Sequence, residues 1–268
     1  MDDQQFRQLL NRFGFSWSGY RKVRKGVKKR IKRHMISLEC YNIAAYLAEL
    51  DKSDEVRKGC EFLLTVSISR FYRDREFWQA LEKKFLPELI KRKMERIRIW
   101  SAGCACGDEV YSFKIVWDCL KNSFEHIPKL EVIATDMNPD YIDRAREGIY
   151  SSSSLKELKK EFQSKYLKKK KGKKLFEVNA SLKKDVIWKI HHLLSDPPGS
   201  EFDIIFLRNN ILTYYEDQLK KKAFRKVLKS LSPYGLLIIG SHESLPFETT
   251  DLIGVAPYPF VFRKELKK

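Results

Sequence analysis

Two acidic residues lie where the sequence could bind a ligand through charge. The first, Glu109, follows a loop with Gly103 and Gly107, and that loop comes after the apolar run 97–100. Glycine lets the backbone turn tightly and lets a ligand approach closely. A dinucleotide phosphate would favour the G-x-G-x-x-G spacing at a helix start, where carboxylates would repel it. The loop therefore favours a cationic group, such as the amino group of S-adenosylmethionine; an ordinary capped helix is the alternative.

The second acid, Asp136, comes directly after the apolar run 130–135. In nucleotide-binding α/β folds an acid at this place accepts hydrogen bonds from ribose hydroxyls. Asp136 could instead cap the helix that begins at Pro139, but Asn138 is better placed to do so. We therefore expect Asp136 to be free for ribose.

Two further polar segments lie beside apolar runs. Arg208 and Asn209 follow the run 203–207, and such side chains are costly to bury unless a ligand or partner satisfies them. A capped turn is the alternative there. The segment 67–74 (Ser-Ile-Ser-Arg-Phe-Tyr-Arg-Asp) joins the two parts of the chain and by itself would be an ordinary polar linker.

The elements that position these residues alternate between strands and helices from residue 97 onward. This alternation predicts a mostly parallel sheet with helices on both faces, which binds ligands at the carboxyl ends of its strands. The predicted strands are 97–100, 130–135, 186–190, 203–207, 236–239 and 260–262. The predicted helices are 76–93, 109–121, 139–146 and 218–231.

Domain boundaries follow from changes in this pattern. Residues 1–66 lack proline and have apolar residues at helical spacing, which predicts an N-terminal helical domain. Residues 67–96 would form a linker and junction helix, and 97–268 the ligand-binding domain. Within that domain, the lysine run 168–174 contains Gly172, which predicts a tight turn between two short strands. We expect a small inserted subdomain at about 155–184.

Composition narrows the function classes. The formal net charge of +18 predicts an acidic partner: nucleic acid, anionic membrane or protein. The five cysteines are odd in number and sparse, which indicates a reducing compartment, and their spacing predicts no metal site. No apolar run is long enough to span a membrane, and the acidic, polar start is unlike a secretory signal.

Taken together, these segments resemble the chemotaxis receptor methyltransferases, the CheR family, across nearly the whole chain. That family reads W-S-A-G-C-S-T-G-E-E-P-Y-S after its first strand, and this chain has W-S-A-G-C-A-C-G-D-E-V-Y-S at 100–112. The family's A-T-D-I, F-D-x-I-F-C-R-N and F-F-R-D correspond to 134–137, 202–209 and 71–74. The resemblance implies an N-terminal helical domain, a Rossmann-like class I methyltransferase domain and an inserted antiparallel subdomain. It also implies S-adenosylmethionine as cofactor and S-adenosylhomocysteine as product.

The resemblance implies roles for single residues as well. The implied cofactor contacts are Ser67, Ser69, Arg73, Gly103, Glu109, Asp136, His192, Leu193, Arg208 and Asn209. Arg73 and Tyr214 would act beside the transferable methyl group as catalytic residues. The tyrosine follows Arg-Asn by one residue more than in the family, so Tyr215 stays an alternative to Tyr214. Val110 in place of the family's proline indicates a divergent branch.

The implied reaction is methyl transfer to a glutamate carboxylate of an acidic acceptor protein, such as the cytoplasmic helices of a chemoreceptor. We expect a cytoplasmic monomer. A nucleic-acid methyltransferase and a cofactor-binding regulatory module are the alternatives. The first is disfavoured because Asp196-Pro-Pro-Gly199 lacks the aromatic residue of the D-P-P-[YFW] signature and precedes its strand.

The segment 21–33 predicts a basic helix. Nine of its thirteen residues are lysine or arginine, and it contains no acidic residue. Like charges four residues apart, as at Lys25 and Lys29, destabilise a helix. We expect Val23, Val27 and Ile31 to be its buried stripe, and the charged faces to meet an acidic partner rather than solvent alone.

Overall fold

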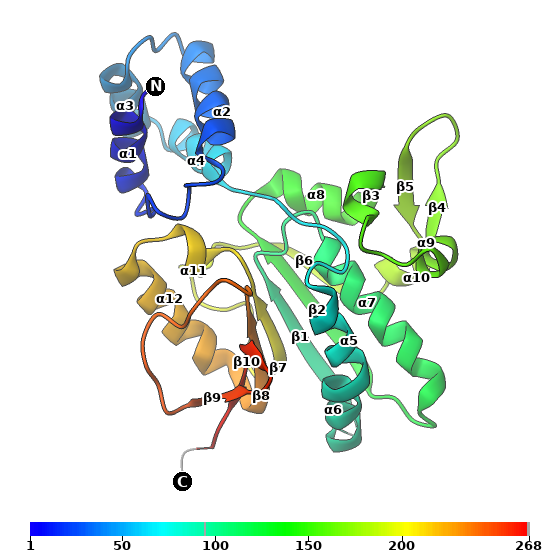
Figure 1. Ribbon diagram of the computed structural model, residues 1–268. Helices are drawn as coiled ribbons and strands as arrows, with labels where there is room; N and C mark the ends of the chain where they lie inside the picture. The colour runs from blue at the N-terminus through cyan, green and yellow to red at the C-terminus, as the bar shows by residue number, and fades with distance from the viewer. Residues whose placement is uncertain (94, 267–268) are drawn as a thin grey trace.

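A seven-stranded sheet forms the centre of the computed structural model, which describes residues 1–93 and 95–266 (Figure 1). The strand order is β6-β2-β1-β7-β8-β10-β9, with β10 antiparallel to β8 and β9, and parallel pairing from β6 through β8. The strands are β1 (Arg96–Ala102), β2 (Lys129–Asp136), β6 (Val186–Ile190), β7 (Phe202–Leu207), β8 (Leu231–Ile239), β9 (Leu252–Val255) and β10 (Tyr258–Lys264). The predicted mostly parallel sheet with helices on both faces is confirmed.

Burial on both faces explains the apolar runs of the central strands. All residues of β7 are buried, with Ile204 and Phe206 in one core and Ile205 and Leu207 in the other, as the two-residue period of a strand requires. The six predicted strands are present. The prediction placed the start of β8 too late, because its pairing with β7 continues back to Leu231 through a register shift. β9 is not predicted, since its short run is largely exposed.

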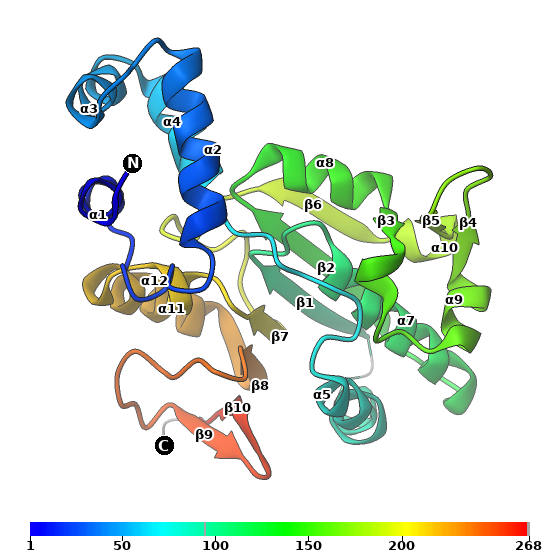
Figure 2. The ribbon, with the colours of Figure 1, turned by 45° about the horizontal axis from the view of Figure 1, so that its top comes forward.

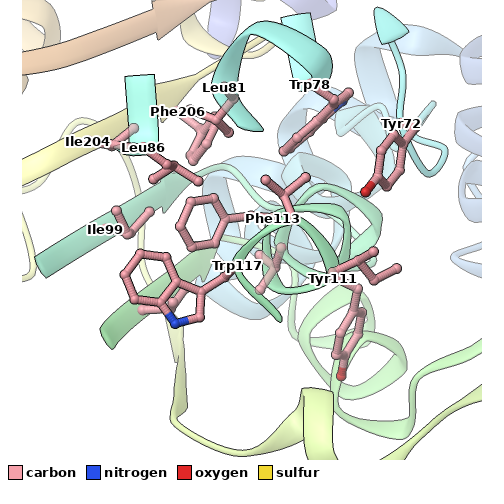
Figure 3. Close-up of a cluster of buried hydrophobic side chains, with 14 of the residues drawn as sticks. Tyr72, Trp78, Leu81, Leu86, Ile99, Tyr111, Phe113, Trp117, Ile204 and Phe206 are labelled. Carbon is pink, nitrogen blue, oxygen red and sulfur yellow. The ribbon is translucent and has the colours of Figure 1, made fainter. Parts of the chain in front are cut away.

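Helices cover both faces of the sheet (Figure 1). One face carries α5 (Arg75–Ala80), a π-helical segment (Leu81–Phe85), α6 (Leu86–Arg92), α7 (Asp108–Leu120) and α8 (Pro139–Glu147). The other face carries α11 (Ile211–Tyr214) and α12 (Asp217–Ser230). The predicted single helix at 76–93 is therefore interrupted by a π-helical segment. Figure 3 shows Trp78 and Leu81 packed over Phe113 of α7 and Phe206 of β7.

The N-terminal helices are α1 (Asp3–Arg12), α2 (Arg24–Ser37), α3 (Ile43–Lys52) and α4 (Asp54–Leu64). Their apolar side chains join the core on the α12 face of the sheet. A backbone bridge between Phe15 and Tyr215 ties the loop after α1 to the end of α11. The hydroxyl of Tyr20 donates to the carbonyl of Leu64 (2.9 Å), which fixes the end of α4. The helices thus lie against the element that carries the candidate tyrosines.

A separate antiparallel sheet of order β3-β5-β4 lies beside the main one, with β3 (Ile149–Ser151), β4 (Leu167–Lys169) and β5 (Leu175–Val178). The predicted turn between two short strands is confirmed, because β4 pairs antiparallel with β5 around Gly172, whose φ is +69°. α9 (Lys160–Tyr166) and α10 (Ala180–Lys183) flank these strands. The sheet begins at Ile149, before the expected start of the insertion at about 155. The domain boundaries themselves stay a prediction.

Candidate functional site

A cavity lies at the carboxyl ends of β1, β2 and β7, with the segment 65–74 as one wall. Figure 2 shows this segment running from α4 across the sheet to α5. The empty volume is about 1010 Å³, including space open to solvent. The predicted residues that line the cavity are Ser69, Arg73, Gly103, Glu109, Asp136, Leu193, Arg208, Asn209 and Tyr214. Residues far apart in sequence thus meet in one site.

The loop after β1 forms the cavity floor. Its backbone N–H groups at Gly103 and Cys104 both donate to the carbonyl of Thr135 at the end of β2 (2.8 Å each). Gly103 has a φ of +81°, and a Cβ atom there would lie 2.5 Å from the side-chain nitrogen of Asn210. Glycine at this position therefore lets the loop turn tightly and lets the side chain of Asn210 pack directly against it.

Asp136 stands at the end of β2 and is 9% exposed. Its carboxylate accepts from the backbone N–H of Ala105 (2.9 Å) and of Asn138 (2.9 Å), which fixes its orientation. Burial raises the pKa of Asp136, and these backbone hydrogen bonds oppose the shift. The side chain of Asn138 accepts from the N–H of Asp140 and caps α8, as predicted. Asp136 is therefore not used as that cap.

Arg208 forms the charged centre of the site, and its side chain is only 5% exposed. One guanidinium nitrogen donates to Glu109 (3.0 Å), and the other lies 2.5 Å from the carboxylate of Asp74. The hydroxyl of Ser101 donates to the second oxygen of Glu109 (2.8 Å). A buried arginine with two carboxylates is held rigidly, since a buried charge must be paired. Asp74 was not a predicted site residue, although it ends the 71–74 motif.

Arg73 projects from the wall segment between two residues of left-handed backbone, Tyr72 (φ +53°) and Asp74 (φ +64°). One guanidinium nitrogen of Arg73 donates to the carbonyl of Ile68 (3.1 Å), and the other donates to the side-chain oxygen of Asn209 (3.3 Å). These contacts orient the guanidinium at the cavity, which Arg73 lines.

Both candidate tyrosines line the cavity, but their neighbours differ. Burial raises the pKa of Tyr214, the nearby charge of Arg73 lowers it, and that of Glu243 raises it. Tyr215 is 7% exposed, and its hydroxyl lies 3.3 Å from Nε2 of His192. The surroundings of Tyr214 therefore match a role beside Arg73, whereas Tyr215 lies with His192.

Ser67 and His192, two of the predicted cofactor contacts, are not among the described residues that line the cavity. The neighbouring His191 lines it instead. His192 lies 3.3 Å from Glu61 of α4 and accepts from the N–H of Leu194 (3.1 Å) through Nδ1. In this structure His192 links the N-terminal helices to the sheet.

The arrangement matches a known family. The model of the CheR methyltransferase, SAM-binding domain, matches residues 67–260. The chain belongs to the CheR methyltransferase family. A chemotaxis protein methyltransferase of Borreliella burgdorferi is 30% identical over 248 residues, which cover 88% of this chain and 85% of that protein. One of Listeria monocytogenes is 28% identical over 219 residues, which cover 82% of this chain and 81% of that protein.

This CheR family chain is therefore an S-adenosylmethionine-dependent methyltransferase, and the donor set of the cavity fits that cofactor. The Glu109–Arg208 pair offers one negative and one positive charge. These charges are opposite to those of the ammonium and the carboxylate in the amino acid part of S-adenosylmethionine. Asp136 offers a buried acceptor for hydroxyl groups, and Met137 and Leu193 supply apolar wall nearby. Within residues 1–93 and 95–266, no three His, Cys, Asp or Glu side chains gather as metal ligands, and no helix is long and apolar enough to cross a membrane.

Asp108 is a titratable group beneath the wall segment that the sequence did not single out. It is 3% exposed, and burial raises its pKa to about 6, although its own backbone N–H and the Ser69 hydroxyl favour the charged form. A carboxyl whose pKa is higher in the folded chain binds its proton more tightly there. The free energy of unfolding therefore falls as the pH rises from about 4 to about 6, and it stays lower above that range.

We expect Asp108→Asn to stabilise the CheR family chain at alkaline pH. A rise from 3.8 to about 6 corresponds to about 3 kcal/mol of destabilisation at pH 8, and part of it should persist because the amide also lacks a full set of partners. Urea unfolding at pH 8 should show a gain of about 1–2 kcal/mol that shrinks toward pH 4. An equal difference at both pH values would mean that Asp108 does not titrate in this range.

Proposed function

We propose that the chain transfers the methyl group of S-adenosylmethionine to glutamate side-chain carboxylates of an acceptor protein, and that this protein is a chemoreceptor-like signalling protein. The main support is Arg73, which is fixed at the cavity wall beside Asn209 and Tyr214. A guanidinium binds a carboxylate through two parallel hydrogen bonds, and a phenol can add a third. The similarity to chemotaxis protein methyltransferases supports the pathway.

The residues would divide the work as follows. Glu109 and Arg208 would bind the amino acid end of the cofactor, Asp136 the ribose, and Leu193 the adenine. The bound cofactor supplies an electrophilic methyl group on a sulfonium. Arg73 and Tyr214 would orient the acceptor carboxylate in line with that methyl. No general base is required, because a glutamate is already ionised near pH 7.

A nucleic-acid acceptor has less support. None of the residues of the Asp196-Pro-Pro-Gly199 segment lines the cavity in the described chain. Asp196 instead pairs with Lys226 of α12 (3.1 Å), and its backbone carbonyl accepts a hydrogen bond from Nε2 of His191 (2.7 Å). The segment is thus engaged in holding the loop between β6 and β7.

The proposed reaction is tested by the chemical nature of the product. Lysate of the source cells is incubated with the purified chain and methyl-tritiated S-adenosylmethionine, and the labelled proteins are then treated with mild alkali. Carboxyl methyl esters should release most of the label as methanol. Label that resists alkali and remains on protein would indicate N-methylation, and label that follows the nucleic-acid fraction would support the alternative.

The acceptor would dock on the exposed basic side of α2. The apolar stripe of this helix is largely as predicted. Val27 and Ile31 are buried, whereas Val23 is only partly buried. The segment itself contains no acidic residue, but Asp3 of α1 pairs with both Lys28 and Arg24 and offsets part of the positive charge. The helix itself begins at Arg24 rather than Arg21. The exposed basic side chains that remain are Arg21, Lys22, Lys25, Lys29, Lys32 and Arg33.

Reversing Lys25, Lys29 and Arg33 to glutamate should raise the acceptor KM about tenfold and flatten its dependence on salt. Charge-driven encounter is screened by salt, so removing the charge removes the dependence. The Kd for S-adenosylhomocysteine should not change. The matched control reverses Lys83, Lys84 and Lys91, which are exposed on the junction helices at the far end of the molecule (Figure 1). If both triple variants methylate alike, α2 is only a solvated face.

The same proposal includes a cytoplasmic location and action as a monomer. Chemoreceptor methylation sites would be reached from the cytoplasm. Size-exclusion chromatography with light scattering should give a mass near 31.7 kDa for the chain.

A further inference from the structure

Glu243 holds together three parts of the structure that end near the proposed methyl-transfer site. It lies after β8, in the loop that leads toward β9. One carboxylate oxygen accepts from the N–H of Asn209 (2.8 Å) and of Gly240 (2.7 Å). The other accepts from the hydroxyl of Thr213. Glu243 thus connects the ends of β7 and β8 with the short helix α11.

Of the residues that Glu243 holds, Asn209 faces the cavity, and Thr213 adjoins a residue that does. Asn209 has a left-handed backbone (φ +53°), an unfavourable conformation that its surroundings must stabilise. Its side-chain oxygen accepts a hydrogen bond from the guanidinium of Arg73 (3.3 Å). Thr213 directly precedes Tyr214 on α11. Asn209, Arg73 and Tyr214 line the cavity, whereas Glu243 itself is not among the described residues that do.

Gly240 shows how closely these groups are packed. A Cβ atom at this position would lie 2.7 Å from the carboxylate of Glu243 and 2.8 Å from the side-chain oxygen of Asn209. Both distances are too short for a side chain to be accepted without movement of one of the two. The absence of a side chain at Gly240 therefore lets Glu243 and the Asn209 amide approach the same point.

We infer that Glu243 is a positioning residue for methyl transfer, which acts by fixing Asn209 and α11 so that Arg73 and Tyr214 share one orientation. The inference rests on the proposed roles of Arg73 and Tyr214. Glu243 would not touch the acceptor or the cofactor. A shift of about 1 Å in such groups lowers rates by up to about a hundredfold.

The test compares the full chain with Glu243→Ala, Glu243→Gln and Thr213→Val. The initial rate of tritium transfer to source-cell lysate is measured at saturating S-adenosylmethionine, and the Kd for S-adenosylhomocysteine is measured by calorimetry. Glu243→Ala should lower the rate about thirtyfold with a Kd within about threefold of the original. Glu243→Gln should recover most of the rate, since its amide oxygen can still accept from both backbone N–H groups. Thr213→Val should lose about fivefold.

The matched control is Glu248→Ala, an exposed glutamate in the same loop, which should keep the original rate. An unchanged rate in Glu243→Ala would overturn the inference. So would a rate loss fully explained by weaker binding of S-adenosylhomocysteine. If Glu243→Ala does not fold, Thr213→Val decides, and an original rate in that variant would overturn the inference. Alkali resistance of the label would instead contradict the proposed acceptor group and leave the rate comparison valid.

Discussion

Replacing Arg73 by alanine should lower kcat/KM for methyl transfer by about a hundredfold to a thousandfold, a loss of about 3–4 kcal/mol of transition-state stabilisation. The guanidinium would no longer hold the acceptor carboxylate in line with the methyl group. The Kd for S-adenosylhomocysteine, measured by calorimetry, should stay within about threefold. Cofactor binding is spared because the Glu109–Arg208 pair and Asp136 do not depend on the Arg73 side chain.

Arg73→Lys and Arg75→Ala serve as controls for this loss. Lysine keeps the charge but lacks the planar fork, so it should restore only a small part of the rate. Arg75 is exposed at the start of α5, and its removal should leave both rate and thermal midpoint nearly unchanged. Turnover that survives in Arg73→Ala would remove Arg73 from the reaction.

The second large effect is expected from Glu109→Gln. Arg208 would lose one of its two carboxylate partners while its side chain stays 5% exposed, and the cofactor ammonium would lose its countercharge. Breaking a buried pair by removing one partner costs about 3–5 kcal/mol, and the remaining contact with Asp74 should limit the loss of unfolding free energy to about 1–3 kcal/mol. The Kd for S-adenosylhomocysteine should rise about thirtyfold or more, which corresponds to about 2 kcal/mol.

Glu131→Gln is the matched control for Glu109→Gln. Glu131 pairs with Arg98 at 2.9 Å outside the cavity and is 30% exposed, so its loss should cost at most about 1 kcal/mol and leave the Kd unchanged. Equal changes in Kd for both variants would show that Glu109 acts only through general stability. Urea unfolding and calorimetry on the same preparations separate the two effects.

The sequence predicts most of the sheet because buried parallel strands are nearly continuous apolar runs. The strand ends then bring Glu109, Asp136 and Arg208 to one edge, which is a consequence of parallel topology rather than of any single motif. Local spacing also predicted the cap at Asn138. These features depend on neighbouring residues or on the strand order alone.

Contacts between distant side chains were harder to predict. Asp74 ends a segment that resembles the family, and Glu243 lies in the loop after β8, yet their partners Arg208 and Asn209 are far away in sequence. The partner of Lys28 lies on another helix, at Asp3, so the basic segment alone does not show this ion pair. The choice between neighbouring residues, as at His191 and His192, depends on the exact path of a loop, which periodicity does not determine.

The most direct test of the proposed site is a crystal structure of the chain with S-adenosylhomocysteine bound. The ribose hydroxyls should lie within hydrogen-bond distance of Asp136, and the amino acid group should lie against Glu109 and Arg208. The sulfur atom should face Arg73 and Tyr214, where the acceptor carboxylate would enter. A product molecule outside this cavity, or one whose sulfur faces away from Arg73 and Tyr214, would contradict the proposed site.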